Sequence, residues 1–284
     1  IHHNWSSSHS LIGSFDDLNN SSVDDVAKFF KTYYAPNNAA LVIVGDIQIA
    51  ETKKAIETYF GDIPSQPKPK RPDLTEPAFE PQKQVYKDPL ARVPTVLVGF
   101  PGPKRRTPDF YAMFVIDAIL SNGDSSRFRL DLVKGKESVI QYQGGLGFPF
   151  GGATDYRDPG EFTYFIFYKP TFTGDQIVGQ VQDEIAKLQD APIDAKELAR
   201  VKTLLRANFI SGLQSSLTRA QALAQYEIAD GNPSLINHDM DSVMAVTADQ
   251  VQAAAKKYLT PDKRAVLEIQ PAPRPAAPAQ KGGN

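Results

Sequence analysis

The sequence has no cysteine, no long apolar run and almost no net charge. Without cysteine, the 284-residue chain can form neither disulfides nor thiolate metal sites. For the same reason, cysteine usage does not indicate whether its compartment is oxidising or reducing. No apolar stretch approaches the roughly 18–20 residues of a membrane span. The formal net charge is −2 and the isoelectric point is about 6.1. No basic field therefore points to nucleic acid or to an anionic membrane surface as a partner.

The hydrophobic content, the chain length and a proline-rich segment predict a packed globular protein in two parts. Hydrophobic residues make up 41% and aromatic residues 10% of a chain that exceeds the usual size of one core. Six prolines within residues 64–82 predict a semi-rigid, extended linker. We therefore predict a first part at 1–64, a linker at 65–82 and a second part at 83–270. Residues 271–284, rich in proline, alanine and glycine, are predicted to form a disordered tail.

Hydrophobic periodicity and turn residues predict a mixture of helices and strands. The predicted helices cover 22–34, 50–60, 108–121, 175–188, 194–223 and 247–258, with a shorter helix that ends at Leu132. The predicted strands cover 40–45, 84–87, 95–100, 139–148, 161–168 and 265–269. The run Leu41–Val44 is apolar throughout, as in a strand buried on both faces. Because the elements do not alternate strictly and residues 144–152 look like a hairpin connection, we predict an α+β fold.

One pattern occurs twice, 225 residues apart. Residues 22–44 read SVDDVAKFFKTYYAPNNAALVIV and residues 247–269 read TADQVQAAAKKYLTPDKRAVLEI, with six identical positions in one register. Each copy predicts a capped helix, a proline turn and a strand. Convergent local chemistry could produce part of this match. The shared register across all three elements favours a duplicated fold, with each half-domain an antiparallel or mixed sheet covered by helices.

The two copies differ in length. The second copy has about 165 residues before its signature helix, whereas the first has 21. We therefore expect the chain to be a fragment that lacks about the first 140 residues of the first copy. The N-terminal sequence IHHNWSSSHSLIGS, which is neither an initiator methionine nor a signal peptide, agrees with this expectation.

Four short motifs follow one another in residues 9–64. They are IGSFDDL at 12–18, YYAPNNA at 33–39, LVIVGD at 41–46 and YFGDIP at 59–64. In this order and spacing they resemble the insulinase/pitrilysin family of zinc metallopeptidases, especially its bacterial and mitochondrial-processing-peptidase branch. Residues 83–270 resemble the second half-domain of that family, including a Ser-Ser-Arg step at 125–127. The resemblance implies a metallopeptidase fold of the LuxS/processing-peptidase type.

The family resemblance also implies where catalysis takes place. Paired half-domains face one another across a chamber, and the first carries an H-x-x-E-H zinc motif whose glutamate is the general base. No H-x-x-E-H occurs in this sequence. The corresponding helix of the second copy, 108–121, offers only Asp109 and Asp117 as possible ligands. We therefore expect no catalytic or metal-binding residue in this chain, and zinc only in the parent protein.

Three histidines near the N-terminus are an alternative place for a metal. His2, His3 and His9 cluster, and imidazole is a common zinc ligand. No carboxylate stands at helical spacing to join them, so we interpret the cluster as an exposed polar loop.

The resemblance implies six candidate substrate-binding residues. The segment SNGDSSR at 121–127 occupies the place of a family loop that presents substrate, which points to Gly123, Ser125 and Arg127; a plain Asn-Gly turn would also explain it. Some members use an arginine and a tyrosine, seven residues apart, to hydrogen-bond substrate backbone. Alignment places Lys134 and Gln141 at these positions. Tyr142 is one residue away, on the opposite face of a strand.

These inferences predict the C-terminal part of a zinc metalloendopeptidase that hydrolyses peptides enclosed between half-domains, with this fragment inactive by itself. The expected partners are a peptide substrate, the missing zinc-bearing segment and a homologous subunit, in the bacterial periplasm or another exported location. One alternative is a non-catalytic subunit that holds substrate or stabilises such a peptidase. A third possibility is an unrelated α+β binding module. An H-x-x-E-H upstream of Ile1 would separate the enzyme from the subunit.

Overall fold

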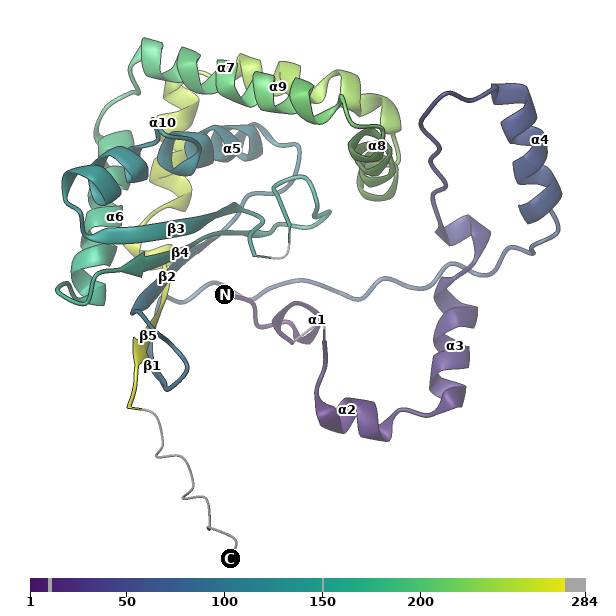
Figure 1. Cartoon of the computed structure of the whole chain (residues 1–284), viewed down its shortest axis with the longest axis horizontal. Coiled ribbons are helices and arrows are strands. Elements are labelled where there is room, and N and C mark those ends of the chain that lie inside the picture. The colour runs from purple at the N-terminus through teal and green to yellow at the C-terminus, as the bar shows by residue number, and fades with distance from the viewer. Residues whose placement is uncertain (10–11, 150, 274–284) are drawn as a thin grey trace, which may run out of the picture. The chain divides into compact units, whose positions relative to one another are not determined.

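The computed structural model describes residues 1–9, 12–149 and 151–273, and it divides the chain into two compact units (Figure 1). The first unit contains residues 1–78 and 204–241, and the second begins at Phe79 and contains the rest. The predicted boundaries between a first half-domain, a linker and a second half-domain stay a prediction. Most of the predicted tail lies outside the described residues.

The second unit contains a five-stranded sheet in the order β1-β5-β2-β4-β3. Its strands are β1 (Gln82–Asp88), β2 (Thr95–Pro101), β3 (Val139–Leu146), β4 (Glu161–Tyr168) and β5 (Ala265–Pro271). Strand β1 runs parallel to β5, and all other neighbours are antiparallel. The sheet is therefore mixed, and the predicted α+β class is confirmed. Of the predicted hairpin connection at 144–152, residues 144–146 are the end of β3, and residues 147–149, 151 and 152 lie between β3 and β4; residue 150 lies outside the described residues.

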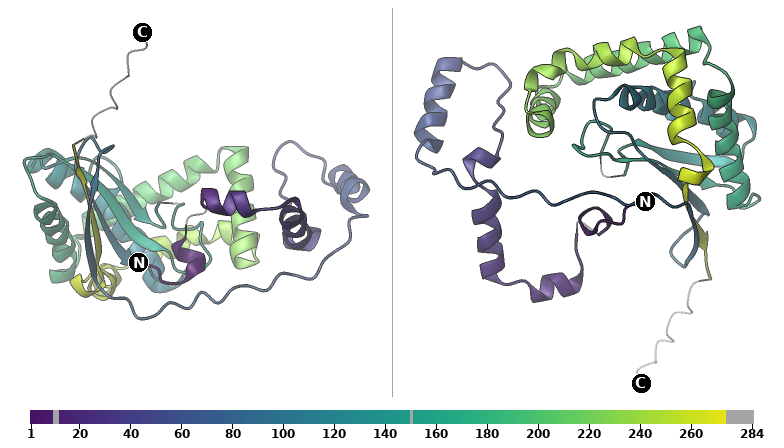
Figure 2. Two further views of the ribbon diagram at one scale, coloured as in Figure 1. Left: turned by 90° about the horizontal axis from the view of Figure 1, so that it is seen from below. Right: turned by 180° about the vertical axis from the view of Figure 1, so that it is seen from behind.

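Three helices pack on one face of this sheet: α5 (Pro108–Ser121), α6 (Gly174–Asp190) and α10 (Ala248–Tyr258) (Figures 1 and 2). Side chains that alternate along the central strands supply the core beneath them, because successive residues of a strand point to opposite faces. In β2 these are Val96, Val98 and Phe100, all fully buried, and in β4 they include Phe162 and Ile166. The FTYFIFY run is thus explained by its place in the middle of the sheet.

The predicted long helix at 194–223 is wrong. The structure has α7 (Ala195–Gly212) followed by α8 (Ser216–Asp230). The break occurs because Ser215 serves as an N-cap, and its side chain accepts a hydrogen bond from the Thr218 backbone. The short elements after α8 are η3 (Pro233–Asn237) and α9 (Asp239–Ala245), and the short helix predicted to end at Leu132 is a π-helix, η2 (Phe128–Gly135). Across the described residues, no helix is both long and apolar enough to cross a bilayer.

Residues 1–78 of the first unit form separate helices. These are α1 (Trp5–Ser8), α2 (Phe15–Asn20), α3 (Val23–Tyr33), the 3-10 turn η1 (Pro36–Asn38) and α4 (Ile49–Phe60). Both α2 and α3 begin with a capping box, in which a serine hydroxyl and an aspartate three residues later satisfy each other's backbone amides. The predicted helices 22–34 and 50–60 are therefore confirmed within one residue at each end.

The predicted strand at 40–45 does not form. Residues 39–44 have no strand pairing, and Leu41 and Ile43 are 59% and 42% exposed. A strand needs a neighbour for its backbone hydrogen bonds, and none of the described residues supplies one here. Residues 41–44 have the composition of a buried strand, but no neighbouring strand among the described residues covers them.

Helix α3 and helix α10 match each other in detail. Their bounds lie 225 residues apart at both ends, both begin with a capping box, and each leads into a 3-10 turn, η1 or η4 (Pro261–Lys263). After η4 the chain forms β5, whereas after η1 the corresponding segment stays unpaired. The described residues contain one sheet of this type, so the predicted duplication of half-domains is not shown within this chain.

Candidate functional site

The loop between α5 and η2 holds three of the predicted substrate-binding residues. Gly123 has a left-handed φ of 80°, a conformation that glycine adopts without steric cost. Gly123 and Ser125 are exposed, and the chain turns inward at Ser126, which is fully buried. The Ser126 backbone amide donates to the Gly123 carbonyl at 3.2 Å and closes the turn. The loop therefore presents Gly123 and Ser125 to solvent.

Tyr142 connects this loop to strand β3. Its hydroxyl lies 2.9 Å from the Ser126 hydroxyl and 3.1 Å from the Ser121 carbonyl oxygen. Its ring meets Phe128 edge-on, with centroids 5.6 Å apart. Partial burial raises the pKa of the Tyr142 hydroxyl above its ordinary value. Two separate parts of the predicted substrate site, the loop and the strand, are thus brought together.

Arg127 is held by an ion pair within the same unit. Its Nε and Nη2 donate to the two carboxylate oxygens of Glu197 at 3.0 and 2.8 Å. Such a two-pronged arrangement is strong and fixes the guanidinium plane. Arg200, one turn further along α7, donates to the Ser125 carbonyl at 3.1 Å. Helix α7 therefore positions the loop, and contact of Arg127 with a substrate would compete with its pairing to Glu197.

Lys134 and Gln141 are both exposed. Lys134 lies in the last turn of η2 and Gln141 lies on β3. Gln141 pairs with Phe167 of β4, and Tyr142 pairs with Ile166. Because neighbouring side chains of a strand point to opposite faces, an exposed amide and a half-buried phenol lie on opposite faces of the sheet.

The two aspartates of α5 have different surroundings. Asp109, in the first turn, accepts hydrogen bonds from Lys257 Nζ at 2.6 Å and from the Tyr258 hydroxyl at 2.9 Å. The hydrogen bond from Lys257 lowers the pKa of Asp109. This carboxylate therefore connects α5 to α10.

Asp117 connects α5 to strands β3 and β4. Its carboxylate accepts hydrogen bonds from Ser121 Oγ and the Tyr164 hydroxyl, both at 2.8 Å, and from the Leu146 backbone amide at 3.2 Å. Desolvation by the surrounding residues raises its pKa. A Cβ at Gly145 would lie 2.3 Å from the carboxylate, so this close approach requires glycine. The sequence pointed to Asp117 only as a possible metal ligand, although an aspartate among apolar residues in the interior of a helix is a visible signal for a buried hydrogen-bond acceptor.

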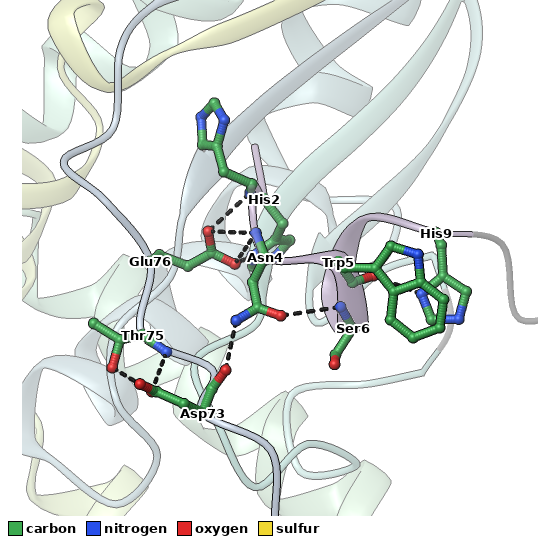
Figure 3. Close-up of polar contacts among 9 residues, drawn as sticks. His2, Asn4, Trp5, Ser6, His9, Asp73, Thr75 and Glu76 are labelled. Carbon is green, nitrogen blue, oxygen red and sulfur yellow. Dashed lines mark hydrogen bonds and ion pairs between the residues drawn. The ribbon is translucent and has the colours of Figure 1, made fainter.

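The side chains of His2 and His9 do not converge on one point (Figure 3). His2 Nδ1 lies 3.1 Å from Glu76 Oε1, and the same carboxylate accepts the His3 backbone amide at 2.8 Å. His9 instead stacks on Trp5 with ring centroids 3.9 Å apart. The cluster predicted from the sequence thus connects the N-terminal segment to the proline-rich segment and does not form a metal site.

Over the described parts of the chain, no group of three or more histidine, cysteine, aspartate or glutamate side chains could hold a metal ion. Asp109 and Asp117 are each engaged by hydrogen-bond donors from other elements. The described side chains therefore do not fit a zinc site with three protein ligands.

Each comparison with known proteins finds peptidases or parts of peptidases. Residues 20–205 match the family model described as "Peptidase M16 inactive domain". The chain is 24% identical over 251 residues to the zinc protease PqqE of Helicobacter pylori, covering 87% of this chain and 55% of that protein. It is 22% identical over 254 residues to the beta subunit of the mitochondrial-processing peptidase of Lentinula edodes, covering 88% and 54%. The chain thus spans about half the length of these relatives.

Solved structures share the fold. A protease from Helicobacter pylori superposes with a TM-score of 0.82 at 21% identity, covering 92% of this chain and 62% of that one. A peptidase M16 inactive domain from Pseudomonas fluorescens superposes with a TM-score of 0.80 at 19% identity, covering 96% and 63%. At these identities the likeness concerns the fold.

Proposed function

This chain belongs to the M16 peptidase family, whose inactive domain matches residues 20–205, and from that membership we propose that it is the C-terminal, non-catalytic part of a zinc-dependent metalloendopeptidase. The match to the inactive domain carries the proposal. It is supported by the lack of H-x-x-E-H in all 284 residues. The predicted resemblance to zinc metallopeptidases is confirmed by the relatives that are named as zinc proteases.

In this proposal the chain encloses and positions a peptide that a zinc-bearing half-domain cleaves. The relatives are about twice as long as the part that this chain matches, which leaves room for such a half-domain. An exported location and a homologous partner subunit belong to the same proposal.

Residues 1–64 are proposed to be the end of the first, zinc-type half-domain. The support comes from the apolar stripe of α3, where Val26 and Phe30 are 51% and 50% exposed. The equivalent positions of α10, Val251 and Ala255, are fully buried in the second unit. A helix with the same cap, length and turn thus buries its stripe in one place and exposes it in the other. The rest of the first half-domain would cover α3 and pair with residues 40–45.

The substrate-binding residues are proposed to be those on the loop and the adjoining strand: Gly123, Ser125, Arg127, Lys134, Gln141 and Tyr142. Their support is the contact between Tyr142 and Ser126, which brings loop and strand together. Gly123, Ser125, Lys134 and Gln141 are exposed and accessible to a peptide.

A second candidate function is that of a non-catalytic subunit in a two-chain peptidase. The observation that favours it is the similarity to proteins named as subunits of the mitochondrial-processing peptidase. In this case the whole chain, including any upstream segment, would lack the zinc motif and would hold substrate or stabilise its partner.

Hydrolysis of a fluorogenic peptide by the purified chain tests whether this part is inactive alone. We expect no turnover above the blank, with added zinc or with a chelator, because the described residues supply no three-ligand site. Zinc-dependent hydrolysis that a chelator abolishes would overturn the proposal.

The coding sequence upstream of Ile1 separates the two candidate functions. An H-x-x-E-H in that sequence predicts that the extended chain hydrolyses the peptide when zinc is present. The matched control is the extended chain in which the glutamate of that motif is replaced by glutamine, which should be inactive but should still bind zinc. An upstream segment without the motif would favour the subunit.

A further inference from the structure

The two edge strands of the sheet differ in how they are protected. Strand β1 reads QKQVYKD and carries Lys83, Lys87 and Asp88, whereas β3 reads VIQYQGGL and has neither a charge nor a proline. The outer edge of an edge strand presents unpaired amides and carbonyls that invite another strand, and proteins commonly block it with lysine, proline or a bulge. Of these devices, β3 has only a register irregularity between Val139 and Gln141. Its edge is therefore the less protected one.

The hydrogen bonding between β3 and β4 shows which backbone groups of β3 point outward. The Gly147 amide donates to the Glu161 carbonyl of β4 at 2.7 Å. In an antiparallel pair the direction of the backbone groups alternates along the strand. Gln143, like Gly147, therefore faces β4, and Tyr142 and Gly144 direct their amides and carbonyls away from it. These two residues offer four hydrogen-bonding groups to the open side.

The open stretch of this edge is short and has defined ends. At its C-terminal end, the outward amide of Leu146 donates to Asp117 at 3.2 Å and is not available. At its N-terminal end, the irregularity before Gln141 interrupts the regular strand. Between these ends Gln141 and Gln143 are exposed to solvent, and Tyr142 and Gly144 are half-buried.

We propose that strand β3 binds an extended peptide as an additional strand, through the backbone groups of Tyr142 and Gly144. The proposal rests on the proposed function, because a non-catalytic half-domain that holds peptide needs a surface for it. Backbone pairing recognises the extended conformation without requiring a particular sequence. Alternate side chains of the peptide would lie beside Gln141 and Gln143, on the face of the sheet opposite α5.

The length of the open stretch favours a peptide over a second copy of the chain. Residues 141–145 span about 17 Å at about 3.4 Å per residue. A second copy of the chain paired over that distance would bury far less surface than the roughly 1,000 Å² that a stable protein–protein interface needs. It does match a peptide segment of a few residues.

Amide hydrogen exchange, followed by NMR on the 284-residue chain, tests the proposal. The probe is an uncharged, acetylated and amidated octapeptide of alternating threonine and valine. At a peptide concentration about ten times its Kd, exchange of the Tyr142 and Gly144 amides should slow by about tenfold. The Gln143 amide, already paired with β4, should change little. The amides of β1 serve as an internal control and should not respond.

A second measurement uses peptides that are N-methylated at one position at a time. Methylation of alternate residues, whose amides face β3, should abolish binding, and methylation of the residues between them should not. Protection elsewhere in the chain, or a loss of binding that does not alternate, would overturn the β3 proposal while leaving a peptide-holding function intact. Absence of any binding at millimolar peptide would count against both. Protection of Tyr142 and Gly144 that depends on protein concentration without peptide would overturn it in favour of self-pairing.

Discussion

Two valines at equivalent positions allow a matched test of the proposal that residues 1–64 are the end of an incomplete half-domain. Val26 on α3 and Val251 on α10 occupy the same place after the same type of cap. Val26 is 51% exposed and Val251 is fully buried. Replacing each by alanine makes an identical chemical change in two helices of equal length.

The expected effects differ because burial differs. Val251→Ala removes two buried methyl groups, worth about 0.8 kcal/mol each, and leaves a cavity, for a loss of about 1.5–3 kcal/mol. Val26→Ala loses at most about half of that transfer energy, and alanine recovers about 0.5 kcal/mol through its better helix propensity. The net effect of Val26→Ala should therefore lie within about 0.5 kcal/mol of zero.

Urea unfolding, followed by circular dichroism, measures the difference. We expect a lower midpoint for Val251→Ala and an unchanged midpoint for Val26→Ala. In a chain extended upstream to include the proposed zinc-type half-domain, Val26→Ala should become destabilising as well. Equal effects in the present chain would refute the burial argument, and a neutral Val26→Ala in the extended, folded chain would refute the half-domain assignment.

Two further substitutions test how the second unit is held together. Asp117→Asn should cost about 1–3 kcal/mol, because the amide has one acceptor oxygen where the carboxylate has two, so either the Leu146 amide or the Ser121 and Tyr164 hydroxyls lose their acceptor. Since desolvation raises the pKa of Asp117 above 3.8, the stability that its protonation contributes is present below pH 3.8 and is lost as the pH rises through the folded-state pKa. The difference in urea midpoint between wild type and variant should therefore be widest in acid; a difference that does not vary with pH would contradict this. Gly174→Ala places a Cβ 2.5 Å from the buried Glu268 carboxyl carbon, and it should lower the Tm by several degrees. Its control in the same helix is Gly179→Ala, which has no atom within 4 Å of the new Cβ and should not lower the Tm; similar losses for both would exclude the steric explanation.

Local sequence patterns predicted the helices well because their signals lie close together in the chain. Thr107 caps α5, Pro108 occupies its first turn, and the apolar residues that follow continue to Ser121, so the predicted and observed bounds agree. The same holds for α3, where the serine cap and Pro36 mark the two ends. The long helix at 194–223 failed because an N-cap serine in its interior was not recognised.

The structure shows where the predicted site residues lie and leaves their role a prediction. The sequence pointed separately to the 121–127 loop and to Tyr142, and the structure adds that the two meet through Ser126. It could not show that Arg127 pairs with Glu197, because these residues are 70 positions apart and their meeting depends on how α7 packs. The role of these residues in binding substrate stays a proposal.

The sequence by itself determined the family, the absence of H-x-x-E-H and most element boundaries. These depend on residues that are near neighbours along the chain, through caps, turns and periodic burial. Only the tertiary structure decided that β3 is the less protected edge of the sheet, that Asp117 serves as a hydrogen-bond acceptor, and that residues 40–45 remain unpaired. Strand pairing and burial depend on partners far away in sequence. Similar apolar runs therefore form a strand after η4, where partners are present, and an exposed segment after η1, where they are not.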